Sequence, residues 1–281
     1  MIKTIKALAA DIDMTLTAKG AALPEATVEA FRILHRNGVK LGLATGREIS
    51  ETLKQNGTNW GLGFEFDFIV GMNGGMVFDR ETGRAWETAH LSTDEMRTIL
   101  TFMKPLIDKY TIAVSAEGGN WNAMNINADL IASARRHGIN YVDHTNDVEG
   151  FCNKPAFKLM FRTEEDTADE IRKTFLDQFG DIYQMFETYP GSVEIMRKGI
   201  DKGSGLKMYA DWNQLPMENI ITFGDNENDM SLLEASGWGV CLKNGNDKAK
   251  SVADDITEYE CMDGGVGHYL LDHYILPNDL K

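Results

Sequence analysis

The sequence predicts an α/β protein in which a doubly wound parallel sheet is interrupted by an inserted α+β domain. Residues 1–75 alternate between apolar, strand-like runs and helix-like runs. The same rhythm returns near the C-terminus, after a central block with a different pattern. Strands that alternate with helices at this spacing form right-handed βαβ units, and such units build a parallel sheet.

The N-terminal block holds three expected strands. Residues 5–12 are nearly all apolar, as in a parallel strand that is covered on both faces. Pro24 opens a helix and Asn37-Gly38 closes it. The second and third strands are expected at residues 39–44 and 66–70, with a short helix between them.

The central block has its own two-layer α+β pattern. Residues 76–79 and 84–88 flank a turn and predict a hairpin, and Ser92 with Glu95 forms a capping box that begins a helix. Strand, helix, strand, helix and strand are then expected at residues 111–115, 129–137, 156–161, 164–179 and 182–187.

From residue 193 the strand–helix rhythm returns. A helix is expected to begin at Lys202, with strands at 219–223 and 238–242 and a helix between them at 228–235. The predicted domains are therefore a core formed by residues 1–85 and 192–281 and an inserted domain at 86–191.

Composition narrows the classes of partner. The 281 residues carry a formal net charge of −15, which disfavours nucleic acid and anionic membrane surfaces as partners. No apolar run approaches the length of about 18 residues that a membrane span needs, so no membrane partner is expected. Cys152, Cys241 and Cys261 fit neither a disulfide framework nor a zinc site, and they favour a reducing, cytoplasmic location.

Polar residues follow the expected core strands at the points where the strands end. Asp11 and Asp13 follow the first strand, and Thr45-Gly46-Arg47 follows the second. Lys202 begins the helix after the insertion, and an acidic loop at 225–229 follows the next strand. These side chains are expected to converge on one crevice. The acids would repel one another there unless a cation such as Mg²⁺ lay among them.

This set suggests phosphoryl transfer. Asp11 is expected to be ionised at neutral pH and to attack phosphorus, which would form an aspartyl-phosphate. Asp13 is placed to act as general acid/base, a role for which it should lie in a drier spot or near other acids. Thr45 and the Gly46 amide could hold phosphoryl oxygens, and Lys202 supplies positive charge.

At this point the chain resembles a known family. Its motifs Asp11-x-Asp13-x-Thr15-Leu16, Thr45-Gly46-Arg47, Lys202-Gly203 and Gly224-Asp225-x-x-Asn228-Asp229 look like the four motifs of the haloacid dehalogenase (HAD) superfamily. The insertion after Asn73-Gly74-Gly75 and the tail motif Asp263-Gly264-Gly265-Val266 look like subfamily IIB, the Cof-type phosphatases. The resemblance implies a Rossmann-like core, an α/β cap domain, Mg²⁺, and phosphatase activity on a small phosphorylated metabolite, often a sugar phosphate.

The resemblance also implies roles for single residues. Asp11 is the expected nucleophile and Asp13 the general acid/base. The expected Mg²⁺ ligands are Asp11, the Asp13 carbonyl and Asp225, with Asp229 behind them to orient Lys202 or a metal-bound water. Phosphate is expected to be held by Thr45, Gly46, Lys202 and Asn228. Arg47 is either a substrate contact or a surface residue, and Asn73 either a substrate contact or a turn-shaping residue.

One position departs from the family pattern, because Met14 stands where the family usually has glycine. Met14 is therefore expected to affect loop geometry and the size of the substrate. Two other functions stay open: a phosphomutase acting on a sugar phosphate, and a non-catalytic protein that binds a phosphorylated metabolite. The complete set of acids with Lys202 argues against the second.

Overall fold

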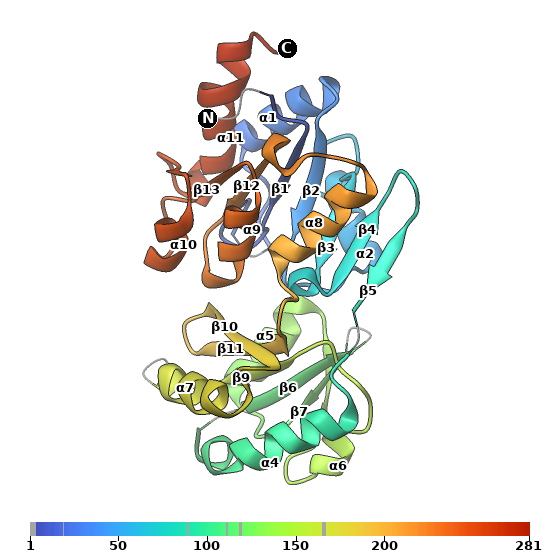
Figure 1. The fold of residues 1–281 in the computed structure, drawn as a ribbon, viewed down its shortest axis with the longest axis vertical. Coiled ribbons are helices and arrows are strands. Elements are labelled where there is room, and N and C mark those ends of the chain that lie inside the picture. Colours follow the sequence, from blue (N-terminus) through green and yellow to red (C-terminus); the bar gives the residue numbers. More distant parts are fainter. Residues whose placement is uncertain (1–3, 19, 89, 111, 118–119, 165–166) are drawn as a thin grey trace. The chain divides into compact units, whose positions relative to one another are not determined.

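The computed structural model describes residues 4–18, 20–88, 90–110, 112–117, 120–164 and 167–281. The chain forms two compact units, one of Met1–Glu87 with Ile200–Lys281 and one of Thr88–Gly199. Each unit has its own sheet (Figure 1) and its own hydrophobic core. The predicted α/β class, with a mostly parallel core sheet and an inserted domain, is confirmed.

The first unit is built on an eight-stranded sheet. In spatial order its strands are β14 (Asp255–Ile256), β13 (Trp238–Cys241), β12 (Ile220–Gly224), β1 (Ala7–Ala10), β2 (Lys40–Ala44), β3 (Phe68–Gly71), β4 (Met76–Asp79) and β5 (Ala85–Glu87). The strands from β14 to β3 are parallel, whereas β4 and β5 form the predicted antiparallel hairpin at one edge. The chain leaves β1 toward β2 on one side and meets β12 on the other, so the strand order reverses at β1.

Helices cover both faces of this sheet (Figure 1). Helices α1 (Glu25–Arg36) and α11 (Gly265–Leu270) pack on one face, and α8 (Lys202–Trp212) and α9 (Met230–Ala235) on the other. Alternate residues of β1 serve the two layers: Leu8 and Ala10 belong to the first core, Ala7 and Ala9 to the second. This two-sided burial explains why the strand is apolar throughout. The remaining α-helices described in this unit are α2 (Glu51–Lys54), α3 (Asn56–Asn59) and α10 (Asp247–Val252).

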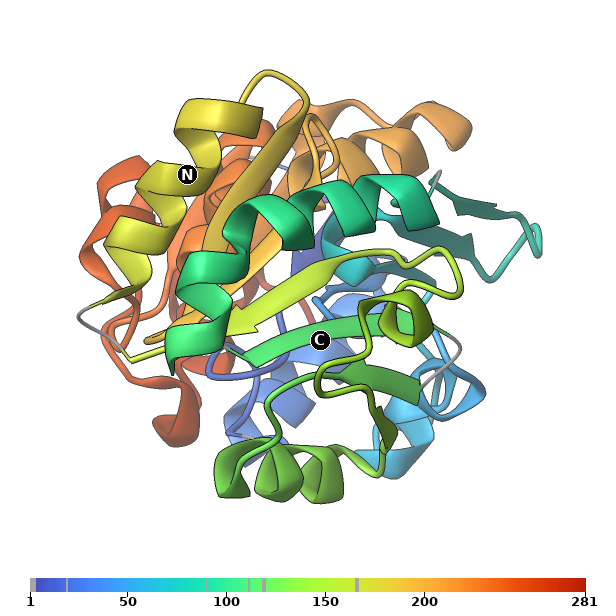
Figure 2. The same ribbon diagram turned by 90° about the horizontal axis from the view of Figure 1, so that it is seen from below.

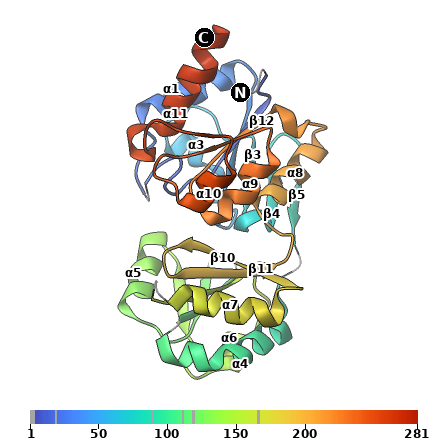
Figure 3. The same cartoon turned by 60° about the vertical axis from the view of Figure 1, so that its left-hand side comes forward.

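The second unit contains a six-stranded sheet. In spatial order its strands are β10 (Tyr183–Tyr189), β11 (Ser192–Arg197), β9 (Leu159–Arg162), β6 (Ile112–Glu117), β7 (Asn120–Ala123) and β8 (Asn140–Asp143). Helices α4 (Thr93–Tyr110) and α7 (Ala168–Phe179) pack on one face (Figures 2 and 3), and their apolar side chains form the core with β9 and β11. On the other face, Arg162 donates to Ser133 of α5 (Ala128–His137). The short helix α6 (Val148–Phe151) completes the set of described helices.

The second unit extends further along the chain than the sequence suggests. Strand β11 pairs in antiparallel register with β10 and β9, so residues 192–199 belong to this unit and not to the core. Its apolar run suits a core strand equally well, and only long-range pairing decides between the two. Strands β7 and β8 were likewise not expected, because their polar residues give little strand signal. Among the described residues, no helix combines the length and the apolar character that crossing a membrane requires.

Candidate active site

Asp11 and Asp225 lie at the ends of two neighbouring strands. Strands β1 and β12 run parallel with Ala10 opposite Phe223, and the N–H of Asp11 donates to the Phe223 carbonyl over 3.0 Å. Asp225 directly follows β12. Because the strand order reverses at β1, both carboxylates stand where doubly wound sheets bind their ligands.

Lys202 supplies the positive charge of this cluster. Asp201 and Ser204 form a capping box at the N-terminus of α8, which fixes Lys202 as the first residue of the helix. The Lys202 side chain is fully buried. Its Nζ lies 2.6 Å from Oδ1 of Asp11 and 2.5 Å from Oδ1 of Asp229. One lysine therefore joins carboxylates from two different segments of the chain.

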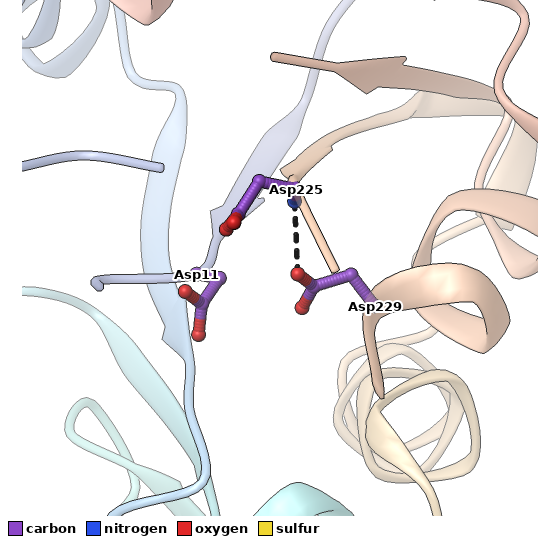
Figure 4. Close-up of side chains that lie close together, drawn as sticks. All are labelled: Asp11, Asp225 and Asp229. Carbon is purple, nitrogen blue, oxygen red and sulfur yellow. Dashed lines mark hydrogen bonds between the residues drawn. The ribbon is translucent and has the colours of Figure 1, made fainter. Parts of the chain in front are cut away.

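The loop after β12 holds Asp229 in place. Oδ2 of Asp229 accepts from the backbone N–H groups of Asp225 at 2.9 Å (Figure 4) and of Asn226 at 3.0 Å. Gly224 permits this close approach, since a Cβ at that position would lie 2.4 Å from Cβ of Asp229. Both carboxylate oxygens of Asp229 are thus engaged, one by Lys202 and the other by the loop.

Three carboxylates share this small volume (Figure 4). Asp11, Asp225 and Asp229 each place one oxygen within 4.8 Å of the others. Burial, followed by the neighbouring acids, raises the pKa of Asp225 to about 8. Burial also raises the pKa of Asp11 to about 7, against the opposing effect of Lys202. Burial alone would lower the pKa of Lys202, but the charges of Asp11 and Asp229 outweigh it and raise that pKa above its usual value. When all three acids are ionised, Lys202 balances only one of their charges, and the carboxylate oxygens then fit a divalent cation such as Mg²⁺.

Thr15 also belongs to this cluster, although the sequence motifs alone suggested no role for it. Its side chain is fully buried, and its hydroxyl donates to Oδ1 of Asp225 over 2.7 Å. Through this bond the loop after β1 orients the carboxylate at the end of β12. The signal was present, because Thr15 belongs to the motif that begins at Asp11, but its partner is not readable from the sequence.

The segments after β2 and β3 lie side by side. Thr45 is buried, its N–H donates to Val70, and its carbonyl accepts from the N–H of Asn73 over 3.0 Å. The Oδ1 of Asn73 accepts from Nδ2 of Asn228 over 3.0 Å, and a Cβ on Gly46 would lie 3.1 Å from the same oxygen. Asn73 has a φ of 50°, in the left-handed region that asparagine tolerates, which agrees with a turn-shaping role. Gly46, Asn73 and Asn228 are therefore neighbours.

Asp13 has surroundings that differ from those expected. Its side chain is one-third exposed, at 33%, and it faces the guanidinium group of Arg47. Nη2 of Arg47 lies 2.7 Å from Oδ1 and 2.9 Å from Oδ2, and Nε lies 3.1 Å from Oδ2. The expectation of a drier position for Asp13 was therefore wrong, although Asp13 lies near enough to Asp11 to help raise the pKa of that carboxyl group. The sequence could not show this pair, because the direction of a long arginine side chain is not encoded in its spacing.

Met14 adopts the backbone conformation that a glycine would favour. Its φ is 67°, in the left-handed region, and the residue is 45% exposed. Two hydrogen bonds hold the loop: the N–H of Met14 donates to Thr17, and Nδ2 of Asn244 donates to the Met14 carbonyl over 2.8 Å. The loop thus holds methionine in a left-handed conformation, at an energetic cost to the backbone.

Comparison with known proteins agrees with this architecture. Residues 8–270 match the family of haloacid dehalogenase-like hydrolases, and the chain belongs to this family. The predicted membership in the HAD superfamily and the predicted enzyme class, a Cof-type phosphatase, are thereby confirmed.

Two relatives match over nearly their whole lengths. The chain is 28% identical over 265 residues to M6_Spy0533 of Streptococcus pyogenes serotype M6, whose name assigns it provisionally as a phosphatase, covering 94% of this chain and 97% of that one. It is 25% identical over 283 residues to the 5-amino-6-(5-phospho-D-ribitylamino)uracil phosphatase YitU of Bacillus subtilis, covering 96% and 97%. Among solved structures, the HAD subclass IIB sugar phosphatase BT4131 has the same fold, with a TM-score of 0.78, 22% identity and coverage of 95% and 98%.

Proposed function

We propose that this phosphatase hydrolyses a phosphomonoester of a small metabolite through a covalent intermediate on Asp11, with Mg²⁺ as cofactor. The observation that carries the proposal is the contact of 2.6 Å between Lys202 and Asp11. A buried lysine fixes the orientation of the carboxylate and places a positive charge where a phosphoryl group would arrive. A carboxylate so placed is suited to nucleophilic attack.

The reaction then takes two steps. In the first, a carboxylate oxygen of Asp11 bonds to phosphorus, the bond from phosphorus to the ester oxygen breaks, and Asp13 gives its proton to the departing oxygen. In the second, Asp13 removes a proton from water, the water oxygen bonds to phosphorus, and the bond to Asp11 breaks to release inorganic phosphate. Asp13 thus serves as acid and then as base.

The remaining site residues bind the phosphoryl group and the metal. Thr45, the Gly46 amide, Lys202 and Asn228 are suited to hold phosphoryl oxygens, and the neighbouring positions of Gly46, Asn73 and Asn228 support this. Asp11, the Asp13 carbonyl and Asp225 would hold Mg²⁺, and Asp229 would act behind them through Lys202. When bound, the metal neutralises negative charge on the transferred group.

The names of two related proteins suggest a class of substrate. YitU is named for a phosphorylated ribityl compound and BT4131 as a sugar phosphatase. Both names describe a phosphate ester on a polyhydroxylated carbon chain. We therefore propose a sugar or polyol phosphomonoester as the substrate.

The test is phosphate release from a panel of sugar phosphates, polyol phosphates, phosphoglycolate, pyridoxal phosphate, FMN and nucleotides. Each substrate is assayed with Mg²⁺ and with chelator, for the wild type, for Asp11→Asn and for the exposed control Asp272→Asn. Turnover that needs both Mg²⁺ and Asp11, and that survives in Asp272→Asn, supports the proposal. Equal release by Asp11→Asn would remove Asp11 as nucleophile. A rearranged sugar phosphate without free phosphate would indicate a phosphomutase.

A further inference from the structure

The guanidinium group of Arg47 contacts the carboxylate of Asp13 through two nitrogens, Nη2 and Nε. Nη2 contacts Oδ1 at 2.7 Å and Oδ2 at 2.9 Å, while Nε contacts Oδ2 at 3.1 Å. Two nitrogens in a rigid plane fix the rotation of a carboxylate as well as its position. A single ammonium group cannot do this, since it acts as a point charge.

The backbone of Arg47 is itself anchored. Its N–H donates to the hydroxyl of Thr45 over 3.2 Å, and its carbonyl accepts from the N–H of Met72 over 2.8 Å. Thr45 is in turn bonded to Val70 and Asn73. Arg47 therefore reaches Asp13 from a segment that the ends of β2 and β3 hold in place.

We propose that Arg47 is a positioning residue that acts on the reaction through the carboxylate of Asp13, and not by binding the phosphoryl group. This inference rests on the proposed function, in which Asp13 protonates the departing oxygen. In that step the O–H bond on Asp13 breaks, an O–H bond forms on the leaving oxygen, and the bond from phosphorus to that oxygen breaks. Arg47 contacts both oxygens of Asp13, Oδ1 at 2.7 Å and Oδ2 at 2.9 and 3.1 Å, so it fixes the rotation of the carboxyl group from which the proton is transferred.

The two possible roles of Arg47 predict different effects of the leaving group. A residue that positions the general acid should matter only when the leaving group needs a proton, whereas a phosphate-binding residue should matter for every substrate. A sugar phosphate releases an alkoxide, which needs a proton, whereas p-nitrophenyl phosphate releases a stable anion, which does not. The measured quantity is kcat/KM, because it reports steps up to phosphoryl transfer and excludes the later hydrolysis. The variants are Arg47→Gln and Arg47→Lys, with Arg36→Gln on an exposed part of α1 as the matched control.

For Arg47→Gln we expect a loss of about 10²-fold on the sugar phosphate, toward the lower end of what general acid catalysis contributes. The loss on p-nitrophenyl phosphate should be less than about threefold, since no proton transfer is needed there. Arg47→Lys should show losses of kcat/KM similar to those of Arg47→Gln, because a lysine cannot contact the carboxylate through two nitrogens. Equal losses on both substrates, or full activity of Arg47→Lys, would overturn the proposal.

A second measurement uses the double variant Asp13→Asn with Arg47→Gln. If Arg47 acts only through Asp13, the double variant should be no slower on the sugar phosphate than Asp13→Asn alone. A further loss equal to that of Arg47→Gln in the wild type would overturn the proposal. Failure of the proposed function looks different, since the wild type itself would then release no phosphate from either substrate. Circular dichroism of each variant confirms that the fold is kept.

Discussion

The ammonium group of Lys202 lies 2.6 Å from Oδ1 of Asp11, although the two residues are 191 positions apart in the chain. The same ammonium group lies 2.5 Å from Oδ1 of Asp229. The capping box fixes Lys202 at the start of α8, and Asp11 lies at the end of β1, where the strand order reverses. The lysine is fully buried, so its charge acts on its two partners with little screening by solvent.

Replacing Lys202 should therefore affect both activity and stability. In Lys202→Met two buried carboxylates lose their counter-charge, and loss of one partner from a buried ion pair costs about 3–5 kcal/mol. We expect kcat/KM to fall by about 10²–10³-fold, as for loss of a charge-stabilising donor. Urea unfolding and phosphate release measure the two effects.

The matched control is Lys207→Met, which changes an exposed lysine on the same helix. It should alter the free energy of unfolding by less than about 0.5 kcal/mol. A Lys202→Met variant that is as active as this control would show that Lys202 takes no part in the reaction.

Binding of Mg²⁺ should depend on pH. The pKa of Asp225 is raised to about 8 by burial and nearby acids, so its carboxyl group is largely protonated below that pH when no metal is bound. A metal takes the ionised form, and the proton must leave. We expect the apparent affinity for Mg²⁺ to rise about tenfold per pH unit below pH 7, with release of at least about one proton per ion. Titration calorimetry in two buffers of different ionisation enthalpy measures this release, and an affinity independent of pH would contradict it.

The same raised pKa makes the metal-free protein less stable at higher pH. Protonation of Asp225 stabilises the folded state fully below the pKa of the unfolded chain, which is 3.8. That contribution is lost as the pH rises through about 8. Added Mg²⁺ should therefore raise the unfolding temperature more at pH 8 than at pH 6, and Asp225→Asn should remove most of the difference. An equal rise at both pH values would count against Asp225 as a ligand.

The bond from Thr15 to Asp225 offers a finer test of the metal site. Thr15→Val keeps the shape of the side chain and removes the hydroxyl that donates over 2.7 Å. Loss of such a supporting bond typically weakens metal binding by about 10–100-fold. Thr17→Val is the control, since that hydroxyl is also buried in the same loop but donates to the Ala22 carbonyl. If both variants bind Mg²⁺ equally, the hydroxyl of Thr15 does not support the site.

Substitutions of Met14 should show how much its left-handed backbone conformation lowers the stability of the protein. A non-glycine residue in the left-handed region costs about 1–2 kcal/mol, while glycine costs about 0.5–1 kcal/mol through the entropy of the unfolded chain. Met14→Gly should therefore leave stability unchanged or raise it by up to about 1 kcal/mol, whereas Met14→Val should lower it. Chemical denaturation gives both values. A Met14→Gly variant that is clearly less stable would show that the methionine side chain is stabilising despite its exposure.

Much of the site could be predicted because it depends on strand order. Asp11 and Asp225 follow from the rule that parallel strands present their carboxyl ends at one edge, and Lys202 follows from the order of the motifs. The partners of Thr15 and Arg47 could not be predicted in this way, since they depend on loop conformation and side-chain rotation. Strand β11 was assigned to the wrong domain because the apolar sequence of a strand does not indicate which sheet it pairs with.

The measurement that tests the central claim most directly is chemical trapping of the covalent intermediate. The enzyme is mixed with a sugar phosphate and Mg²⁺, quenched rapidly, treated with borohydride and digested, and the peptide that contains Asp11 is analysed by mass spectrometry. We predict that Asp11 is converted to the reduced residue only when substrate is present. With p-nitrophenyl phosphate, whose leaving group needs no proton, Asp13→Asn should accumulate more of the intermediate because water is no longer activated. Steady turnover with an unmodified Asp11, or with the modification on another residue, would contradict the account.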